Sequence, residues 1–210
     1  MKSLPQPVAG YLVAGLLFVS CLGLMAVMAS ARPHAPAEPP GTVERLTEPR
    51  VVQGVPCQGY VRLDPGGRLM SCVLSAEHTF GRVVLPANTQ IRSFHPDGAP
   101  NRVHLGRDTR FDGHLCRGEG PGGWMAGFYP DGRLDHCFLK ERETIDGLLC
   151  ESGTFWGEIT GGVIVQFHPD GTLKSCRLAA DATIAGESFR KGRRVWLGAA
   201  GKPEAKPAGR

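Results

Sequence analysis

The sequence predicts an all-β fold, a meander of about four and a half β-hairpin repeats that follows an N-terminal hydrophobic signal or anchor helix. A Pro-Asp-Gly turn recurs between runs of alternating apolar and polar residues, as in residues 163–167 and 173–178, and this arrangement is typical of hairpins. No window of about 12 residues beyond the N-terminal segment shows helical periodicity. The 29 Gly and 17 Pro among 210 residues exclude a coiled coil and a collagen. The repeats are compatible with an elongated stack or a partly closed barrel.

Residues 1–31 are expected to be a signal peptide or a transmembrane anchor. The stretch 8–31 is apolar, follows Lys2 and ends in Ala-Ser-Ala, which suits cleavage by signal peptidase. An apolar run of this length can also span a bilayer, so the anchor stays open as an alternative. Lipidation at Cys21 is a third possibility. The chain is therefore expected to be exported, with membrane contact through residues 8–31, to the periplasm, to the extracellular face of the inner membrane, or as a secreted protein.

Three further segments follow this signal. Residues 32–50 are rich in Pro, Ala and Glu and are expected to form a disordered linker. Residues 51–197 carry the repeats, and residues 198–210 form a Gly/Ala/Lys/Pro tail. Residues 190–210 hold seven Lys/Arg and one Glu, a net charge of +6, so the basic character of the chain belongs to its C-terminal end. No nucleic-acid partner is expected, since a solvated terminus accounts for this charge.

Four hairpins follow one another within residues 51–197. Their anchor residues are Leu63, Phe94, Phe128 and Phe167, which are 31, 34 and 39 residues apart. Pro-Asp-Gly follows the last three anchors after one residue, and the first hairpin has the degenerate form Asp-Pro-Gly-Gly. Pro has the φ that a type I turn needs at its second position, and Gly accepts a positive φ. A short strand and a second Gly follow each hairpin, and a truncated copy ends the series at residues 195–197.

Residues 128–134, Phe-Tyr-Pro-Asp-Gly-Arg-Leu, resemble the Tyr-x-x-Asn/Asp-Gly-x-Leu core of bacterial MORN-type hairpin repeats. The resemblance covers seven residues in each unit. The spacing of the units is longer than in that family, and the Gly-x-Trp pattern of the family is missing. The resemblance implies β-hairpin repeats with an interaction or scaffold role, and it carries over no functional residue.

Six cysteines beyond Cys21 recur with the repeat, and an even number in an exported chain indicates disulfides. Units one, three and four each hold one cysteine three residues after a Gly and a second one in the hairpin. Unit two holds neither, and Val84 and Val103 occupy the two equivalent positions. Because both cysteines are lost together, the two positions are expected to bond within one unit. The predicted disulfides are Cys57–Cys72, Cys116–Cys137 and Cys150–Cys176.

Two histidines, His95 and His168, occupy the same repeat position, with Tyr129 between them in the series. A regular stack would place these side chains in one exposed column. They are the candidates for a metal site, although ordinary turn histidines are the simpler interpretation and no bound metal is expected. The glycine-rich segment 118–123 lacks the following helix that a dinucleotide site needs, so no cofactor is expected.

Aromatic residues in loops of variable length are the candidate ligand-binding residues. Trp124, Phe155 and Trp156 are the strongest candidates, and Tyr60 belongs to the same group. Variable loops on a rigid repeated frame commonly carry binding sites. The alternative is that Phe155 and Trp156 fill one end of the stack.

The sequence contains none of the common catalytic motifs, so no catalytic residue is predicted and an enzyme is less expected than a binding protein. The first interpretation is a non-enzymatic bacterial cell-envelope module that presents a disulfide-stapled surface to an envelope protein or polymer. The first alternative is a glycan-directed envelope hydrolase that uses acids from separate repeats, since acids distant in sequence can meet in a fold. The second alternative is a periplasmic metal-binding protein.

Overall fold

A computed structural model describes residues 41–153 and 163–205 of the chain. Contacts divide the chain into residues 1–39 and residues 40–210, and the fold below is that of the second unit. All 19 strands are antiparallel to their partners, and the described residues contain no helix. The prediction of an all-β meander is therefore confirmed. The expected N-terminal signal or anchor and most of the linker lie outside the described residues, and no described helix meets the length and hydropathy that a membrane span requires.

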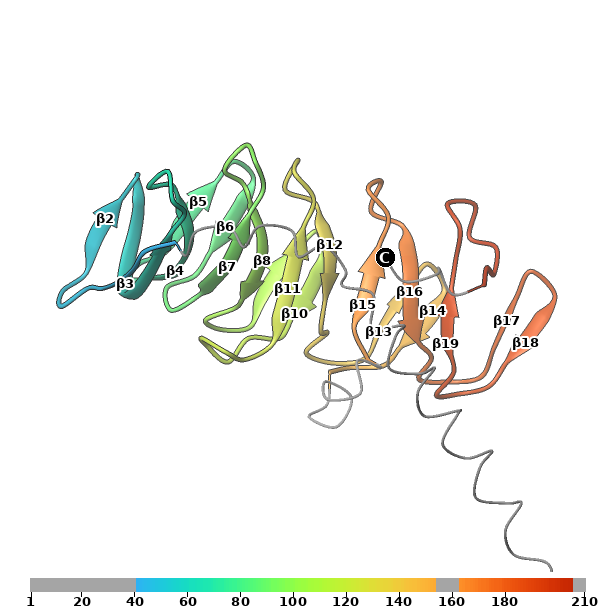
Figure 1. The fold of residues 1–210 in the computed structure, drawn as a ribbon. Coiled ribbons are helices and arrows are strands. Elements are labelled where there is room, and N and C mark those ends of the chain that lie inside the picture. Colours follow the sequence, from blue (N-terminus) through green and yellow to red (C-terminus); the bar gives the residue numbers. More distant parts are fainter. Residues whose placement is uncertain (1–40, 154–162, 206–210) are drawn as a thin grey trace, which may run out of the picture. The chain divides into compact units, whose positions relative to one another are not determined.

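Eleven strands form one main sheet, which contains the four long hairpins. Its strands are β1 (Val43–Arg45), β2 (Arg50–Val52), β3 (Val55–Leu63), β4 (Leu69–Leu74), β7 (Gln90–Phe94), β8 (Pro100–His104), β11 (Met125–Phe128), β12 (Leu134–Cys137), β15 (Val165–Phe167), β16 (Leu173–Arg177) and β19 (Arg194–Trp196). The spatial order is β1-β3-β4-β7-β8-β11-β12-β15-β16-β19, with β2 paired beside β3. The order follows the chain, and the sheet has two ends, β1 and β19 (Figure 1).

The other eight strands form four short hairpins, one after each long hairpin (Figure 1). They are β5 (His78–Phe80) with β6 (Val83–Leu85), β9 (Thr109–Phe111) with β10 (His114–Cys116), β13 (Glu143–Ile145) with β14 (Leu148–Cys150), and β17 (Ala182–Ile184) with β18 (Glu187–Phe189). Each repeat thus contributes a long hairpin to the sheet and a short hairpin beside it.

The turns of the long hairpins have the chemistry that the sequence predicts. In the third hairpin, Tyr129 N–H donates to the Arg133 carbonyl at 2.8 Å and Gly132 N–H donates to the Tyr129 carbonyl at 2.9 Å. Gly132 has a φ of 81°, a conformation that a residue with a Cβ rarely adopts. The carboxylate of Asp131 accepts from Arg133 N–H at 3.0 Å. This aspartate therefore serves the turn, as do its equivalents Asp97 and Asp170.

The core lies between the main sheet and the short hairpins. The inward side chains of the sheet, such as Ile91 and Phe128, and those of the short hairpins, such as Leu85 and Phe111, belong to one buried cluster. The Phe111 ring meets the Phe128 ring edge-on with centroids 4.9 Å apart. Period-2 alternation sends the intervening residues of each sheet strand to the opposite side, which is called the outward face below.

A hydrogen bond from a turn residue to the next long hairpin recurs in three units. Asp146, at a φ of 48°, accepts from Leu173 N–H through Oδ2 at 2.7 Å, and Asp112 accepts from Leu134 N–H in the same way at 2.8 Å. The corresponding acceptor in the first unit is Gln53, whose Oε1 accepts from Leu69 N–H at 3.1 Å. The second unit has Gly81 at the acceptor position and Pro100 at the donor position. Unit two has lost both partners of this bond together, since Pro100 has no N–H to donate.

Two predicted segment boundaries need correction. Strand β1 lies inside the predicted linker 32–50 and pairs with β3, where Val43 faces Arg62, and Leu46 is buried. Residues 198–204, predicted to be tail, fold against β19: Leu197 bridges Pro203 and Glu204 N–H donates to the Trp196 carbonyl at 2.8 Å. Both segments pair with strands near the ends of the open sheet, and a backbone pairing of this kind leaves little signal in composition.

Candidate functional site

Trp124, the described member of the predicted ligand-binding trio, lies in a small second core. Its ring is 4% exposed and meets the Phe138 ring edge-on, with centroids 5.1 Å apart. The guanidinium of Arg117 lies 4.7 Å from the ring centroid. A ring covered in this way has little surface left for a ligand, so Trp124 serves packing in this structure. Phe155 and Trp156 lie outside the described residues.

The residues of the His95, Tyr129 and His168 column hold successive hairpins together. His95 Nε2 is 2.8 Å from the Phe128 carbonyl, Tyr129 Oη donates to the Phe167 carbonyl at 2.8 Å, and His168 Nε2 is 2.9 Å from the Leu197 carbonyl. Each side chain therefore reaches the backbone of the next unit. No group of three or more His, Cys, Asp or Glu side chains within residues 41–153 and 163–205 is arranged to hold a metal. The three side chains are half-buried and not exposed as the sequence predicted.

The six described cysteines are buried free thiols in this structure, and they meet in the three pairs that the sequence predicts. The pKa of Cys72 is raised by its hydrogen bond with Cys57 and by burial. Burial and a hydrogen bond with Cys116 raise the pKa of Cys137 well above its usual value, and the third pair, Cys150 with Cys176, shows the same contact. The contact satisfies one requirement of each disulfide, and the oxidation state stays a prediction.

The position of the missing cysteine in unit two needs correction. Phe80 pairs with Val83 across the β5–β6 turn, as Phe111 pairs with His114 across the β9–β10 turn. Two residues further along, Leu85 is therefore the equivalent of Cys116. Counting from Gly81 led to Val84 because this glycine takes the first turn position, whereas Gly113 takes the second. Leu85 is fully buried, whereas Val84 is 43% exposed.

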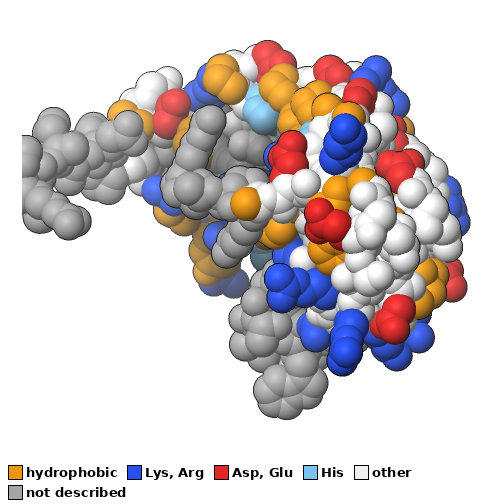
Figure 2. Space-filling model, turned by 90° about the vertical axis from the view of Figure 1, so that its right-hand side faces the viewer, with side chains coloured by type: hydrophobic (Ala, Val, Ile, Leu, Met, Phe, Trp, Pro, Cys, Tyr) orange, Lys and Arg blue, Asp and Glu red, His pale blue; other side chains and the backbone are white. Residues whose placement is uncertain are grey.

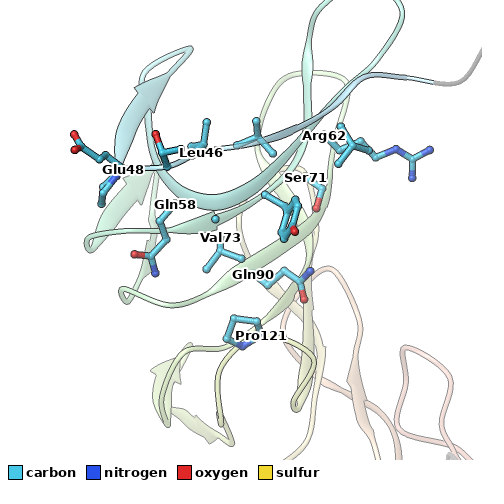
Figure 3. Close-up of a pocket in the computed structure, with 14 residues that line it drawn as sticks. Leu46, Glu48, Gln58, Arg62, Ser71, Val73, Gln90 and Pro121 are labelled. Atoms are coloured by element: carbon cyan, nitrogen blue, oxygen red, sulfur yellow. The ribbon is translucent and has the colours of Figure 1, made fainter.

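A hollow of about 620 Å³ lies on the outward face of the main sheet at its N-terminal end (Figure 3). Strands β3, β4 and β7 form its floor. It is bordered by residues 46–49 and by Pro121. The lining residues are Val43, Leu46, Thr47, Glu48, Pro49, Gln58, Gly59, Tyr60, Val61, Arg62, Ser71, Val73, Gln90 and Pro121. The glycine-rich segment reaches the hollow because Gly122 N–H donates to the Gln90 side chain at 3.2 Å.

The hollow combines an exposed aromatic ring with fixed polar groups. Tyr60 is 59% exposed, and the guanidinium of Arg45 lies 5.9 Å from its ring centroid. Gln58 Nε2 donates to Asn88 at 2.7 Å, and Ser71 Oγ donates to the Ile91 carbonyl at 2.7 Å. These internal bonds orient the polar side chains, and such preorganisation favours ligand binding.

Most of this site was not predicted from the sequence. Tyr60, expected in a loop, lies within β3. No prediction was made for the outward residues Gln58, Ser71 and Gln90. Their signal was available in part, because they alternate with residues that become buried.

Two acid–histidine pairs are the nearest approach to catalytic groups. His114 Nδ1 is 2.8 Å from Glu143 Oε1, and the His114 ring stacks on Phe167 with centroids 4.6 Å apart. His136 Nδ1 is 2.8 Å from Asp135 Oδ2. Burial opposes ionisation of Asp135, but the contacts with His136 and Tyr129 and the charge of Lys174 together outweigh burial and lower its pKa. A carboxyl held in its ionised form is unsuited to act as the general acid of a glycosidase.

These features define the chain as an antiparallel β protein built from alternating long and short hairpins. Comparisons with models of protein families, with curated proteins and with solved structures find no match. The resemblance to MORN-type repeats stays a prediction.

Proposed function

We propose that this protein is a non-enzymatic binding or scaffold module of the bacterial cell envelope, which presents the outward face of its main sheet to another envelope component. The observation that carries the proposal is the hollow around Tyr60, an open site with an exposed aromatic ring and oriented polar groups. The proposal includes an exported chain with residues 1–31 as signal or anchor. It also includes an open stack of about four and a half repeats that three disulfides cross-link.

The bonds between repeats support a scaffold role. Side chains at corresponding positions of successive units reach the backbone of the next unit, as Tyr129 does to Phe167 and Asp146 does to Leu173. Such bonds hold neighbouring hairpins at a fixed spacing, and a repeat frame of fixed spacing supports an extended binding surface.

Site-specific photo-crosslinking tests the proposal. A photo-reactive residue replaces Tyr60 in the full chain, which is expressed in a bacterial host. In the matched control the same residue replaces Val84, which is also exposed but lies on strand β6 of a short hairpin. Tyr60 is expected to give a discrete product with an envelope component, whereas Val84 gives none. If both positions give the same products, or if neither gives one, the proposal is wrong.

A further inference from the structure

The strands β3, β4 and β7 that form the floor of the hollow, and the adjacent strand β8, are basic and contain no acid. Strands β3, β4, β7 and β8 adjoin one another in the sheet, and their sequences hold no Asp or Glu. They carry Arg62, Arg92 and Arg102, and Arg45 lies on β1 beside them. All four arginines are exposed, and none forms an ion pair with another residue of the described ranges 41–153 and 163–205. The outward face therefore carries an excess of positive charge here.

The strand register places these arginines on one face. Arg62 pairs with Ser71 of the hollow, while its neighbour Val61 is fully buried on the other side. Arg102 pairs with Ser93 at an irregularity of β7, which brings it next to Arg92. Two like charges on adjacent strands destabilise a sheet unless an anion lies between them.

The pKa of a neighbouring histidine is lowered in part by the same positive charge. His104 lies on β8, and its Nδ1 is buried without a hydrogen-bond partner among the described residues. Burial lowers the pKa of His104, and the charge of Arg92 lowers it further, although a backbone hydrogen bond at Gly122 opposes both.

The hollow supplies groups of a different kind beside the arginines. The Oε1 atom of Gln58 and the Nε2 atom of Gln90 make no hydrogen bond to the part of the chain that the structure describes, so both remain for a ligand. Among the lining residues, only Glu48 bears a carboxylate. Figure 3 shows Glu48 and Arg62 at opposite ends of the site, with Arg62 pointing away from the other labelled side chains. An aromatic ring with amides suits a neutral polyhydroxyl unit, and the arginine end suits an anion.

On the basis of the proposed function, we infer that this face binds a glycan that bears phosphate groups. The sugar lies in the hollow against Tyr60, and the phosphate groups lie along Arg62, Arg92 and Arg102. Phosphate fits better than a carboxylate because a phosphate monoester carries a charge of about −1.5 to −2 and three acceptor oxygens. One such group can accept from the planar forks of Arg92 and Arg102 together.

Binding of three forms of one polymer tests the inference. Dextran phosphate, carboxymethyl-dextran and unmodified dextran are titrated against the full chain by calorimetry or biolayer interferometry. The test variant carries Arg62→Gln, Arg92→Gln and Arg102→Gln. The control variant carries Arg190→Gln, Lys191→Gln and Arg193→Gln, which remove the same charge from exposed residues between β18 and β19. Figure 2 views the molecule from the side of these strands and shows that Lys and Arg gather there too.

The wild-type protein and the control are expected to bind dextran phosphate more tightly than carboxymethyl-dextran. The test variant is expected to bind dextran phosphate at least about tenfold more weakly, with a smaller dependence on salt. Equal weakening of both variants would show attraction to net charge alone and would overturn the inference, as would tighter binding of carboxymethyl-dextran or no binding of dextran phosphate. Circular dichroism and thermal melting confirm that each variant is folded. The inference fails alone if the Tyr60 crosslink forms while dextran phosphate does not bind, whereas loss of the crosslink contradicts the proposed function itself.

Discussion

The hydrogen bond between Asp146 and Leu173 can be removed without disturbing the turn that supports it. Asp146 has a φ of 48°, so Asp146→Gly keeps a residue that accepts this conformation and removes only the side chain. Leu173 is 1% exposed, and its N–H would lose its acceptor at 2.7 Å. An unsatisfied donor at a partly buried site costs about 1–2 kcal/mol of the free energy of unfolding. For a domain of this size, that loss lowers the melting temperature by about 2–8 °C.

Ala185→Gly is the matched control for this variant. Ala185 occupies the same turn position of the last short hairpin at a φ of 49°, and it has no acceptor side chain to lose. Thermal unfolding is followed by circular dichroism for both variants and the wild-type protein. Asp146→Gly is expected to unfold at a lower temperature than Ala185→Gly. If the two variants shift the melting temperature equally, the bond does not stabilise the contact between repeats.

Three other predictions concern the disulfides, the column and His104. Peptide mapping of the exported protein without reduction is expected to find the three predicted disulfides. They close loops of 14 to 25 intervening residues, and each is expected to add about 3 kcal/mol to the free energy of unfolding. A peptide joining Cys137 to Cys150 would show that the pairing is wrong. Tyr129→Phe removes the 2.8 Å bond to the Phe167 carbonyl and is expected to lower the free energy of unfolding by about 1 kcal/mol in urea titrations, so an unchanged midpoint would contradict its role between repeats. The pKa of His104 is lowered in the folded state, so the unfolded chain binds the proton more readily and stability falls as the pH decreases below about 6.5. His104→Gln is expected to reduce this slope in urea titrations from about pH 7 to about pH 5, and an unchanged slope would count against the assignment.

The turns were predictable because their chemistry is local. Pro130, Asp131 and Gly132 each satisfy a backbone requirement within five residues, so the sequence pattern alone locates the hairpin. The cysteine pairs were predictable for a different reason, because internal repetition makes equivalent positions visible. The same counting failed at Val84, because the glycine of that turn stands one place earlier than in the other units while the strand register is unchanged.

The outward face was not predictable in the same way. Gln58, Ser71 and Gln90 lie on three different strands, 13 and 19 residues apart, and only the pairing of β3, β4 and β7 brings them to one hollow. Trp124 shows the opposite error, because a loop aromatic that the sequence presents as a binding residue is covered by Phe138 and Arg117. The burial of this ring depends on tertiary contacts with Phe138 and Arg117, which the local sequence pattern does not reveal.

The sequence by itself determined the all-β class, the hairpin turns and their recurrence, because φ preferences and period-2 patterns act over a few residues. Tertiary structure alone decided which side chains face outward together. It placed Arg62, Arg92 and Arg102 on one face of strands that contain no acid, and it directed the side chains of the His95 column toward the backbone of the next unit. The physical reason is that strand register joins residues up to 19 positions apart in this part of the sheet and fixes the face of every residue in the strand.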